Sequence, residues 1–169
     1  DSYGGNHRWS WFESDCGPEG DTLLGSFEAK RWTGGNEVRF PSHERALSAD
    51  YRSLDSRDFD AGLRRCLPQS ALHLNARVTA LAPDKVTLAD GRSIAARRIL
   101  DCRDAAPSPH LTGGWQVFLG QHRRMDAPHG VTRPVIMDAT VDQIGGYRFP
   151  YLLPLSETDL FLEDTYYQD

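Results

Sequence analysis

The sequence is short of cysteine, of long apolar runs and of positive charge, and each shortage excludes a class of protein. Its three cysteines, Cys16, Cys66 and Cys102, are widely spaced, so they are not a disulfide framework and a reducing cytoplasm is the expected compartment. No apolar run approaches the roughly 20 residues that span a bilayer. The net charge of −5 argues against a nucleic-acid partner, because such a partner needs a basic surface.

Motifs for several common ligands and reactions are also missing. The sequence has no C-x-x-C pair and its six histidines are dispersed, so no metal site is predicted. It has no G-x-S-x-G nucleophile elbow, no P-loop and no G-x-G-x-x-G dinucleotide fingerprint. The chain opens at Asp1 without a methionine and stops at Asp169 directly after an acidic aromatic stretch. We therefore expect it to be an internal part of a longer protein.

The patterns that are present predict an α+β fold. Ser56 resembles a helix N-cap, and Phe59, Leu63 and Cys66 then fall on one helix face that would pack on a core. Asp90-Gly91 between two apolar runs predicts a two-residue hairpin over 85–96. Residues 15–20 are rich in turn formers, and further strands are expected at 38–41, 51–54, 72–81 and 97–102.

The second half of the chain predicts an antiparallel sheet rich in aromatic residues. Its expected strands are 115–120, 134–142, 147–155 and 160–166. A loop of proline, serine and glycine at 105–114 separates this sheet from the first half. We therefore expect two regions, 1–112 and 113–169.

Two adjacent carboxylates, Glu163 and Asp164, lie in an apolar and aromatic stretch near the end of the chain. Neighbours in a strand point to opposite faces, so both cannot reach one substrate atom unless a bulge intervenes. A turn at 156–159 would place Leu152 opposite Glu163 and Tyr151 opposite Asp164. A carboxyl group that faces leucine is desolvated, which raises its pKa and suits a general acid at neutral pH.

Asp138 is a third candidate acid, in the expected strand 134–142. This strand alternates an apolar face, which includes Val135 and Met137, with a mixed face that carries Asp138. Because one face of an antiparallel sheet is commonly solvated, a solvent-facing and a site-facing Asp138 both remain open.

Three separated stretches make the sequence resemble the bacterial lycopene β-cyclases. They are Gly4-Gly5-Asn6-His7 with Trp9 and Ser10, then Ile136 to Gln143 with Gly146 to Phe149, and finally Phe161-Leu162-Glu163-Asp164-Thr165. The stretches follow the order of the family and extend over nearly the whole chain. The resemblance implies a flavoprotein fold of the aromatic-hydroxylase and geranylgeranyl-reductase type, here without its N-terminal G-x-G-x-x-G unit.

The resemblance also assigns residues to the cofactor. The residues implied for the flavin side of FAD are Gly4, Gly5, Asn6 and His7; those implied nearer the adenine or in the D-x-R-G turn of the family are Val78, Asp101 and Arg103. The sequence departs from the family at four positions: Arg8 replaces a common threonine, Trp11 a phenylalanine, Asp164 a second glutamate, and Asp104 the glycine of that turn.

The chemistry implied is acid-catalysed ring closure without net redox change. Glu163 would protonate a terminal double bond of lycopene, with Asp164 and Asp138 as the other candidate catalytic residues, and loss of a ring proton would give a β-ionone ring. Reduced FAD, generated by NAD(P)H, would stabilise the cation without passing electrons to the product. The insoluble substrate implies docking at a membrane surface. The aromatic residues that would line its tunnel are Tyr147, Phe149, Tyr151 and Phe161.

Two other functions remain open on the same residues. A redox flavoenzyme of the same fold, such as a monooxygenase or prenyl reductase, would consume NAD(P)H in step with its substrate. A non-catalytic carotenoid- or lipid-binding domain would retain pigment by this chain alone.

Overall fold

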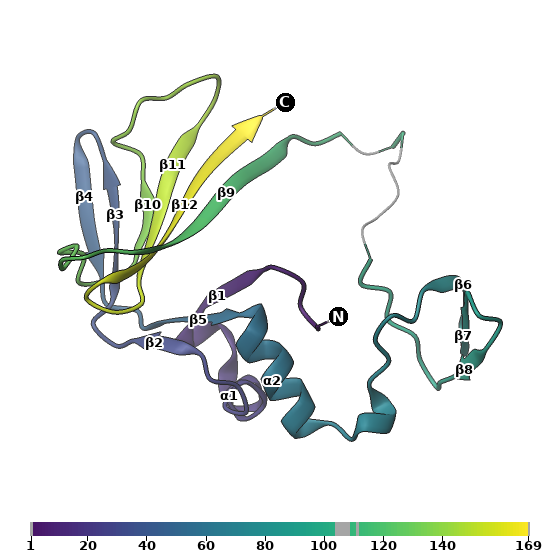
Figure 1. The fold of residues 1–169 in the computed structure, drawn as a ribbon. Helices are drawn as coiled ribbons and strands as arrows, with labels where there is room; N and C mark the ends of the chain where they lie inside the picture. Colours follow the sequence, from purple (N-terminus) through teal and green to yellow (C-terminus); the bar gives the residue numbers. More distant parts are fainter. Residues whose placement is uncertain (1, 104–108, 111, 169) are drawn as a thin grey trace.

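The computed structural model describes residues 2–103, 109, 110 and 112–168, and in that part of the chain helices and sheets are mixed (Figure 1). The helical segments are η1 (Glu13–Asp15), α1 (Gly17–Leu24), α2 (Ser56–Cys66) and η2 (Gln69–Ala71), where η marks a 3₁₀ helix. The strands are β1 (Arg8–Phe12), β2 (Lys30–Trp32), β3 (Asn36–Phe40), β4 (His43–Leu47), β5 (Tyr51–Asp55), β6 (Val78–Ala82), β7 (Lys85–Leu88), β8 (Ser93–Ala95), β9 (Trp115–Arg124), β10 (Val135–Asp138), β11 (Arg148–Pro154) and β12 (Asp159–Gln168). The α+β prediction is confirmed.

The largest sheet has six strands in the order β4-β3-β10-β11-β12-β9. β10 pairs in parallel with β3, and the other neighbours pair antiparallel, which confirms a mixed, largely antiparallel sheet. Strands β3 and β4 come from the first half of the chain and the remaining strands from the second half. The sheet therefore joins the two regions expected at 1–112 and 113–169, and their division into domains remains a prediction.

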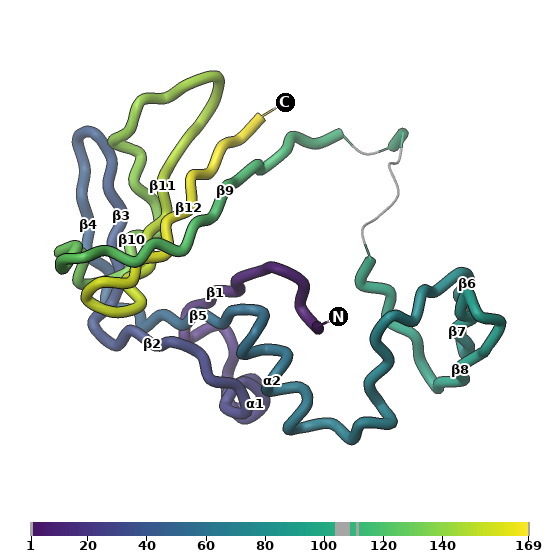
Figure 2. The backbone as a smooth tube through the Cα atoms, in the orientation of Figure 1, coloured from purple at the N-terminus to yellow at the C-terminus, as the bar shows by residue number. Residues whose placement is uncertain are grey.

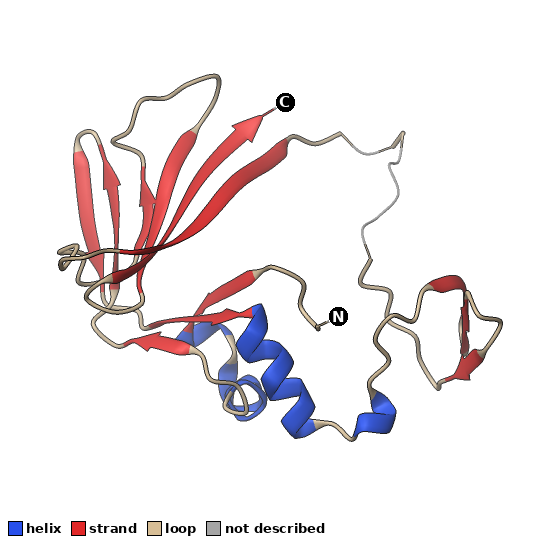
Figure 3. Cartoon of the chain, in the orientation of Figure 1, coloured by secondary structure: helices blue, strands red, loops and turns tan. Residues whose placement is uncertain are grey.

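A second sheet, β1-β5-β2, lies next to the six-stranded sheet, and the protein core is built where the two meet. Trp32 of β2 and Tyr51 of β5 form a buried cluster with Leu153 of β11. Figure 3 shows both α-helices on the other side of this small sheet, away from the large one. The space between the sheets is therefore lined mainly by strands, with the first residues of α2 and the turn before β1 at one end.

The hairpin of β11 and β12 corrects the predicted register by one residue. The backbone N–H of Leu155 donates to the Asp159 carbonyl at 2.9 Å, so the connection has one residue fewer than the expected four-residue turn. Glu163 therefore lies opposite Tyr151 rather than Leu152. Because residues opposite each other in an antiparallel pair share a face, the neighbour of the acid is a tyrosine.

Both helices differ from the predictions at their N-termini. Residues 15–20, expected to form a turn, include the beginning of α1. Pro18 is tolerated in the first turn of this helix because the backbone N–H groups there have no partner within the helix. The N-cap of α2 is Asp55 rather than Ser56, since the Asp55 carboxylate accepts a hydrogen bond of 2.9 Å from the Asp58 amide. An aspartate directly before the helix supplies the same cap that serine would.

The predicted core-facing stripe of α2 is confirmed for two of its three residues. Phe59 and Leu63 are half-buried, and Phe59 stacks on Phe27 with the ring centroids 5.4 Å apart. Cys66 is exposed, because the last turn of α2 extends beyond the small sheet (Figure 1).

The third sheet, β6-β7-β8, contains the predicted hairpin. Gly91 takes a φ of +86° in its turn, a conformation that glycine adopts without steric cost. The strand expected at 72–81 begins only at Val78, and Asn75 before it has a left-handed φ of +55°, which interrupts an extended chain. Residues 97–102 form no strand in the described part of the chain, so that prediction is wrong; they have no pairing partner there.

Figure 2 traces the chain from α2 through the third sheet and on to β9. Several residues of the loop expected at 105–114 lie outside the described residues, as does Asp104. No helix in the described ranges is long and apolar enough to cross a membrane.

Candidate active site

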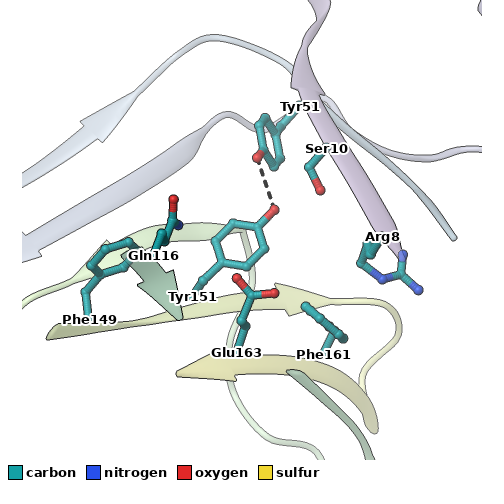
Figure 4. Close-up of a pocket in the computed structure, with 8 residues that line it drawn as sticks. All are labelled: Arg8, Ser10, Tyr51, Gln116, Phe149, Tyr151, Phe161 and Glu163. Carbon is teal, nitrogen blue, oxygen red and sulfur yellow. Dashed lines mark hydrogen bonds between the residues drawn. The ribbon is translucent and has the colours of Figure 1, made fainter. Parts of the chain in front are cut away.

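Glu163 lies in the middle of β12, with a strand on each side. Tyr151 of β11 is its partner on one side and Gly120 of β9 on the other. Its side chain is half-buried and points into the space between the two sheets (Figure 4). A carboxyl group is thus held between a tyrosine and a glycine, on the sheet face that meets the small sheet.

Two adjoining hollows open in front of this carboxyl group. The acid hollow, of about 230 Å³, is drawn in Figure 4. The small sheet contributes Arg8, Ser10 and Tyr51 to it, and the large sheet contributes Gln116, Phe149, Tyr151, Phe161 and Glu163. The wide hollow, of about 840 Å³, shares Arg8, Phe161 and Glu163 with the acid hollow and reaches Asn6 and His7. Glu163 therefore faces both spaces.

The surroundings of Glu163 favour its neutral form. Burial raises the pKa of its carboxyl group, and a hydrogen bond from the Thr165 hydroxyl to Oε1, 3.3 Å long, partly offsets this effect. Thr165 is itself fully buried. A carboxylic acid with a raised pKa keeps its proton nearer to neutral pH, so it can act as a general acid.

Two tyrosines that line the acid hollow, Tyr51 of the small sheet and Tyr151 of the large sheet, contact each other. The hydroxyl groups of Tyr51 and Tyr151 share a hydrogen bond of 3.0 Å, drawn in Figure 4. Burial raises the pKa of both phenols, so both stay neutral. Next to them, the hydroxyl of Ser10 donates to that of Ser53 at 2.9 Å. These polar groups satisfy one another and leave the aromatic faces available to an apolar ligand.

Asp164 lies on the other face of β12 and is held in an ion pair. It lies opposite Pro150, so the expected pairing with Tyr151 is wrong. Arg148 donates to its two carboxylate oxygens at 2.9 and 2.8 Å, and the Tyr166 hydroxyl donates to Oδ2 at 3.0 Å. The Arg148 hydrogen bonds lower the pKa of Asp164. The two adjacent acids therefore point to opposite faces, and their pKa values shift in opposite directions.

Asp138 is also engaged in an ion pair, two strands away from Glu163. Its Oδ2 lies 3.4 Å from Arg39 Nη1 of β3, and its Oδ1 accepts a hydrogen bond from the Thr140 hydroxyl at 2.5 Å. Strand β11 separates β10 from β12. The structure thus does not bring Asp138 to Glu163.

The expected substrate-lining aromatics fall into two groups. Phe149, Tyr151 and Phe161 line the acid hollow. Tyr147 is not among the described residues that line either hollow; its ring packs on Phe149 with the centroids 5.7 Å apart, and its hydroxyl lies 2.9 Å from the sulfur of Met137. Three of the four aromatic residues therefore surround the carboxyl group.

The residues expected at the flavin side of FAD lead into the wide hollow. Gly4 and Gly5 have φ angles of +83° and +59°, which only glycine adopts readily. A Cβ at Gly4 would lie 2.6 Å from the Trp9 ring, so the tight turn needs glycine there. This turn delivers Asn6 and His7 to the hollow that also contains Glu163. Their placement fits a flat ring bound next to the acid.

The residues expected near the adenine or in the D-x-R-G turn are not among the described residues that line either hollow. Val78 begins β6 of the third sheet. Asp101 and Arg103 pair with each other through a hydrogen bond of 2.8 Å, and that pairing lowers the pKa of Asp101 to about 2. Both side chains are exposed. Their assignment to the cofactor stays a prediction.

Part of the lining of the acid hollow was not predicted from the sequence. Arg8, Ser10 and Tyr51 come from strands far away in sequence, and no local pattern marked them as neighbours of Glu163. Gly120 did leave a signal, because an isolated glycine within an apolar strand often marks a close approach of another group. Its partner across the strand pair could only be assigned once the order of the strands was known.

Comparison with known proteins identifies the family of this chain. The family model described as "Lycopene cyclase protein" matches residues 1–169. The chain is 42% identical to the lycopene beta-cyclase of Pseudescherichia vulneris over 164 residues, and 40% identical to that of Pantoea ananas over 168 residues. These alignments cover 97% and 98% of this chain but 42% and 43% of the relatives, so the chain spans less than half of their length.

A solved structure shares the fold at low sequence identity. It is that of "Peptidyl tryptophan dihydroxylase QhpG essential for tryptophylquinone cofactor biogenesis", and it matches with a TM-score of 0.58 and 18% identity over 95% of this chain and 37% of its own. The family match over the whole chain and the identity of 40% or more to curated relatives lead to one conclusion: the chain belongs to the lycopene cyclase family.

Proposed function

We propose that the protein that carries this chain is a lycopene β-cyclase and that Glu163 is its proton donor. The observation that carries the proposal is a half-buried carboxyl group, with a pKa raised by burial, that faces two hollows between the sheets. An inert alkene has no basic group, so its protonation needs a neutral acid that is held out of water.

The reaction follows from that proton. Glu163 donates it to a terminal double bond of lycopene, and a tertiary cation forms. The neighbouring double bond attacks the cation and closes a six-membered ring, and a ring proton is then lost to give the β-ionone end. One proton is gained and one is lost, so the product is an isomer of the substrate and no electrons are consumed.

Aromatic faces would stabilise the cation. Phe149, Tyr151 and Phe161 all line the acid hollow, and the face of an aromatic ring attracts a positive charge. The neutral hydroxyl groups of Tyr51 and Tyr151 are occupied by each other. We therefore assign these side chains to shaping the apolar space and to charge stabilisation, and not to proton transfer.

Asp164 and Asp138 receive supporting roles in this proposal. Asp164 and Arg148 join β12 to β11, the two strands that carry Glu163 and Tyr151. Asp138 and Arg39 join β10 to β3. Each ion pair fixes one strand against the next, and the pair of Asp164 and Arg148 joins two strands that line the hollows.

The cofactor proposed for the complete protein is FAD in its reduced form, kept reduced by NAD(P)H. Gly4, Gly5, Asn6 and His7 would hold its flavin side, since the turn they form opens on the wide hollow beside Glu163. When bound, the group would supply negative charge close to the developing cation. The flavoprotein fold and a peripheral position at a membrane surface, where lycopene dissolves, belong to the same proposal.

The test is the substitution Glu163→Gln in the full-length protein, with Glu157→Gln as the matched control. Glu157 is an exposed glutamate in the turn before β12. We expect Glu163→Gln to abolish ring formation from lycopene in liposomes while flavin binding persists, and Glu157→Gln to keep full turnover. Near-normal turnover of Glu163→Gln would refute the assignment. Oxidation of NAD(P)H in proportion to product would instead indicate a redox flavoenzyme.

A further inference from the structure

Gly120 occupies the position on β9 directly opposite Glu163. It lies within a regular strand and is not among the glycines with positive φ in the described chain. Its backbone conformation is therefore open to any residue, and nothing in the turn chemistry requires glycine. The atoms that a side chain at this position would meet therefore have to explain the glycine.

That space is filled by the ring of Phe161. A Cβ built on Gly120 would lie 2.8 Å from Cζ and 3.1 Å from Cε2 of this ring, and 3.7 Å from Oε2 of Glu163. Carbon atoms in contact are separated by about 3.5–4.0 Å. An alanine at Gly120 would therefore force the ring of Phe161 to move by about 1 Å, whereas the carboxyl group would meet only an ordinary contact.

The displaced ring has little room on its other sides. The Arg8 guanidinium carbon lies over it, 5.2 Å from the centroid. The Tyr151 ring lies 6.4 Å away with its plane turned by 78°. Figure 4 shows Phe161 and Glu163 side by side on β12 beneath these groups. A ring lifted from β9 must therefore enter the hollows that it lines together with Glu163.

We propose that Gly120 is a positioning residue for the reaction: its missing side chain seats the Phe161 ring against β9 and keeps the space before Glu163 open to the end of the polyene. The inference rests on the proposed function, since it concerns the approach of the substrate to the same acid. Because Gly120 has no side chain to form a hydrogen bond or carry a charge, its proposed effect is steric.

The experiment compares Gly120→Ala with Gly34→Ala in the full-length protein. A Cβ at Gly34 would meet no atom within 4 Å, and this glycine also lacks a positive φ, so it is a matched control. A displacement of about 1 Å at a reacting centre can cost about 100-fold in rate. We therefore expect kcat/KM for lycopene to fall by about 100-fold in Gly120→Ala and to stay unchanged in Gly34→Ala.

A second substitution shows whether the effect passes through Phe161. Phe161→Leu removes the two ring atoms that the new Cβ would strike. In a Phe161→Leu background we expect Gly120→Ala to lower kcat/KM by less than about threefold, because contacting residues couple in a double-mutant cycle. A loss of β-sheet stability alone would give the same factor in both backgrounds. If Gly120→Ala fails to fold, recovery of folding in the double variant supports the same contact.

Three results would overturn the inference. They are a wild-type kcat/KM in Gly120→Ala, equal losses in the two backgrounds, or a double variant that does not fold. Each of these leaves the proposed function intact, provided that the unaltered protein cyclises lycopene and Glu163→Gln does not. Absence of cyclisation by the unaltered protein would remove the proposed function itself, and the inference with it.

Discussion

Leu153 is the residue at which the two sheets are joined, so its truncation is the sharpest test of the fold. Its side chain is fully buried and packs on Trp32 and Tyr51 of the small sheet. The Trp32 indole is fixed by a hydrogen bond of 3.0 Å to the Pro154 carbonyl. The surroundings of Leu153 are therefore held by their own contacts and can collapse only partly into a cavity.

The magnitude follows from the atoms removed. Leu153→Ala deletes three buried carbon atoms, which at about 0.8 kcal/mol each amounts to about 2.4 kcal/mol of transfer free energy. The cavity that remains raises the cost, and large-to-small changes of this kind range over about 2–5 kcal/mol. Because the neighbours are held in place, we expect the upper half of that range, about 3.5–5 kcal/mol in the free energy of unfolding.

The measurement is the thermal unfolding of the full-length protein, followed by circular dichroism. The matched control is Leu23→Ala, since Leu23 on α1 is 67% exposed. A loss of 1 kcal/mol lowers Tm by roughly 2–4 °C in a domain of 150–250 residues and by less in a longer chain, so Leu153→Ala should lower the Tm of the full-length protein by about 5 °C or more. A change in Tm no larger than that of Leu23→Ala would refute the view that the packing of the two sheets stabilises the fold.

Two further predictions concern the carboxyl groups. Asp164→Asn should lower stability at neutral pH, because the lowered pKa of Asp164 means that the folded state stabilises its carboxylate form; the difference from the unaltered protein should vanish as the pH falls through that low pKa. Urea unfolding at several pH values checks this, and a loss of turnover without a loss of stability would show that Asp164 takes part directly in the chemistry. Thr165→Val removes the hydrogen bond that lowers the pKa of Glu163, so the protonated, active form should persist to higher pH. The alkaline limb of the kcat/KM profile should move upward, and a downward shift would contradict the assignment of Glu163 as the acid.

Local chemistry was enough to predict several elements from the sequence. The Asp90-Gly91 turn, the position of α2 and the strands that became β5 and β9 to β12 all follow from turn residues, capping and apolar periodicity within a short window. Alternation along β12 also placed Glu163 and Asp164 on opposite faces, because neighbouring side chains in any strand point apart. These predictions needed no knowledge of distant parts of the chain.

The neighbours of Glu163 could not be predicted in this way. A connection one residue shorter than expected moved Tyr151, instead of Leu152, opposite the acid, since the register of a hairpin depends on its turn. Tyr51 reaches Tyr151 across 100 positions of sequence, and Gly120 meets Glu163 because β9 pairs with β12 and not with β10. The sequence by itself determined that an acid would lie in an apolar strand; only the tertiary structure decided what faces it, because the order of strands and the packing of two sheets depend on contacts between residues far apart in the chain.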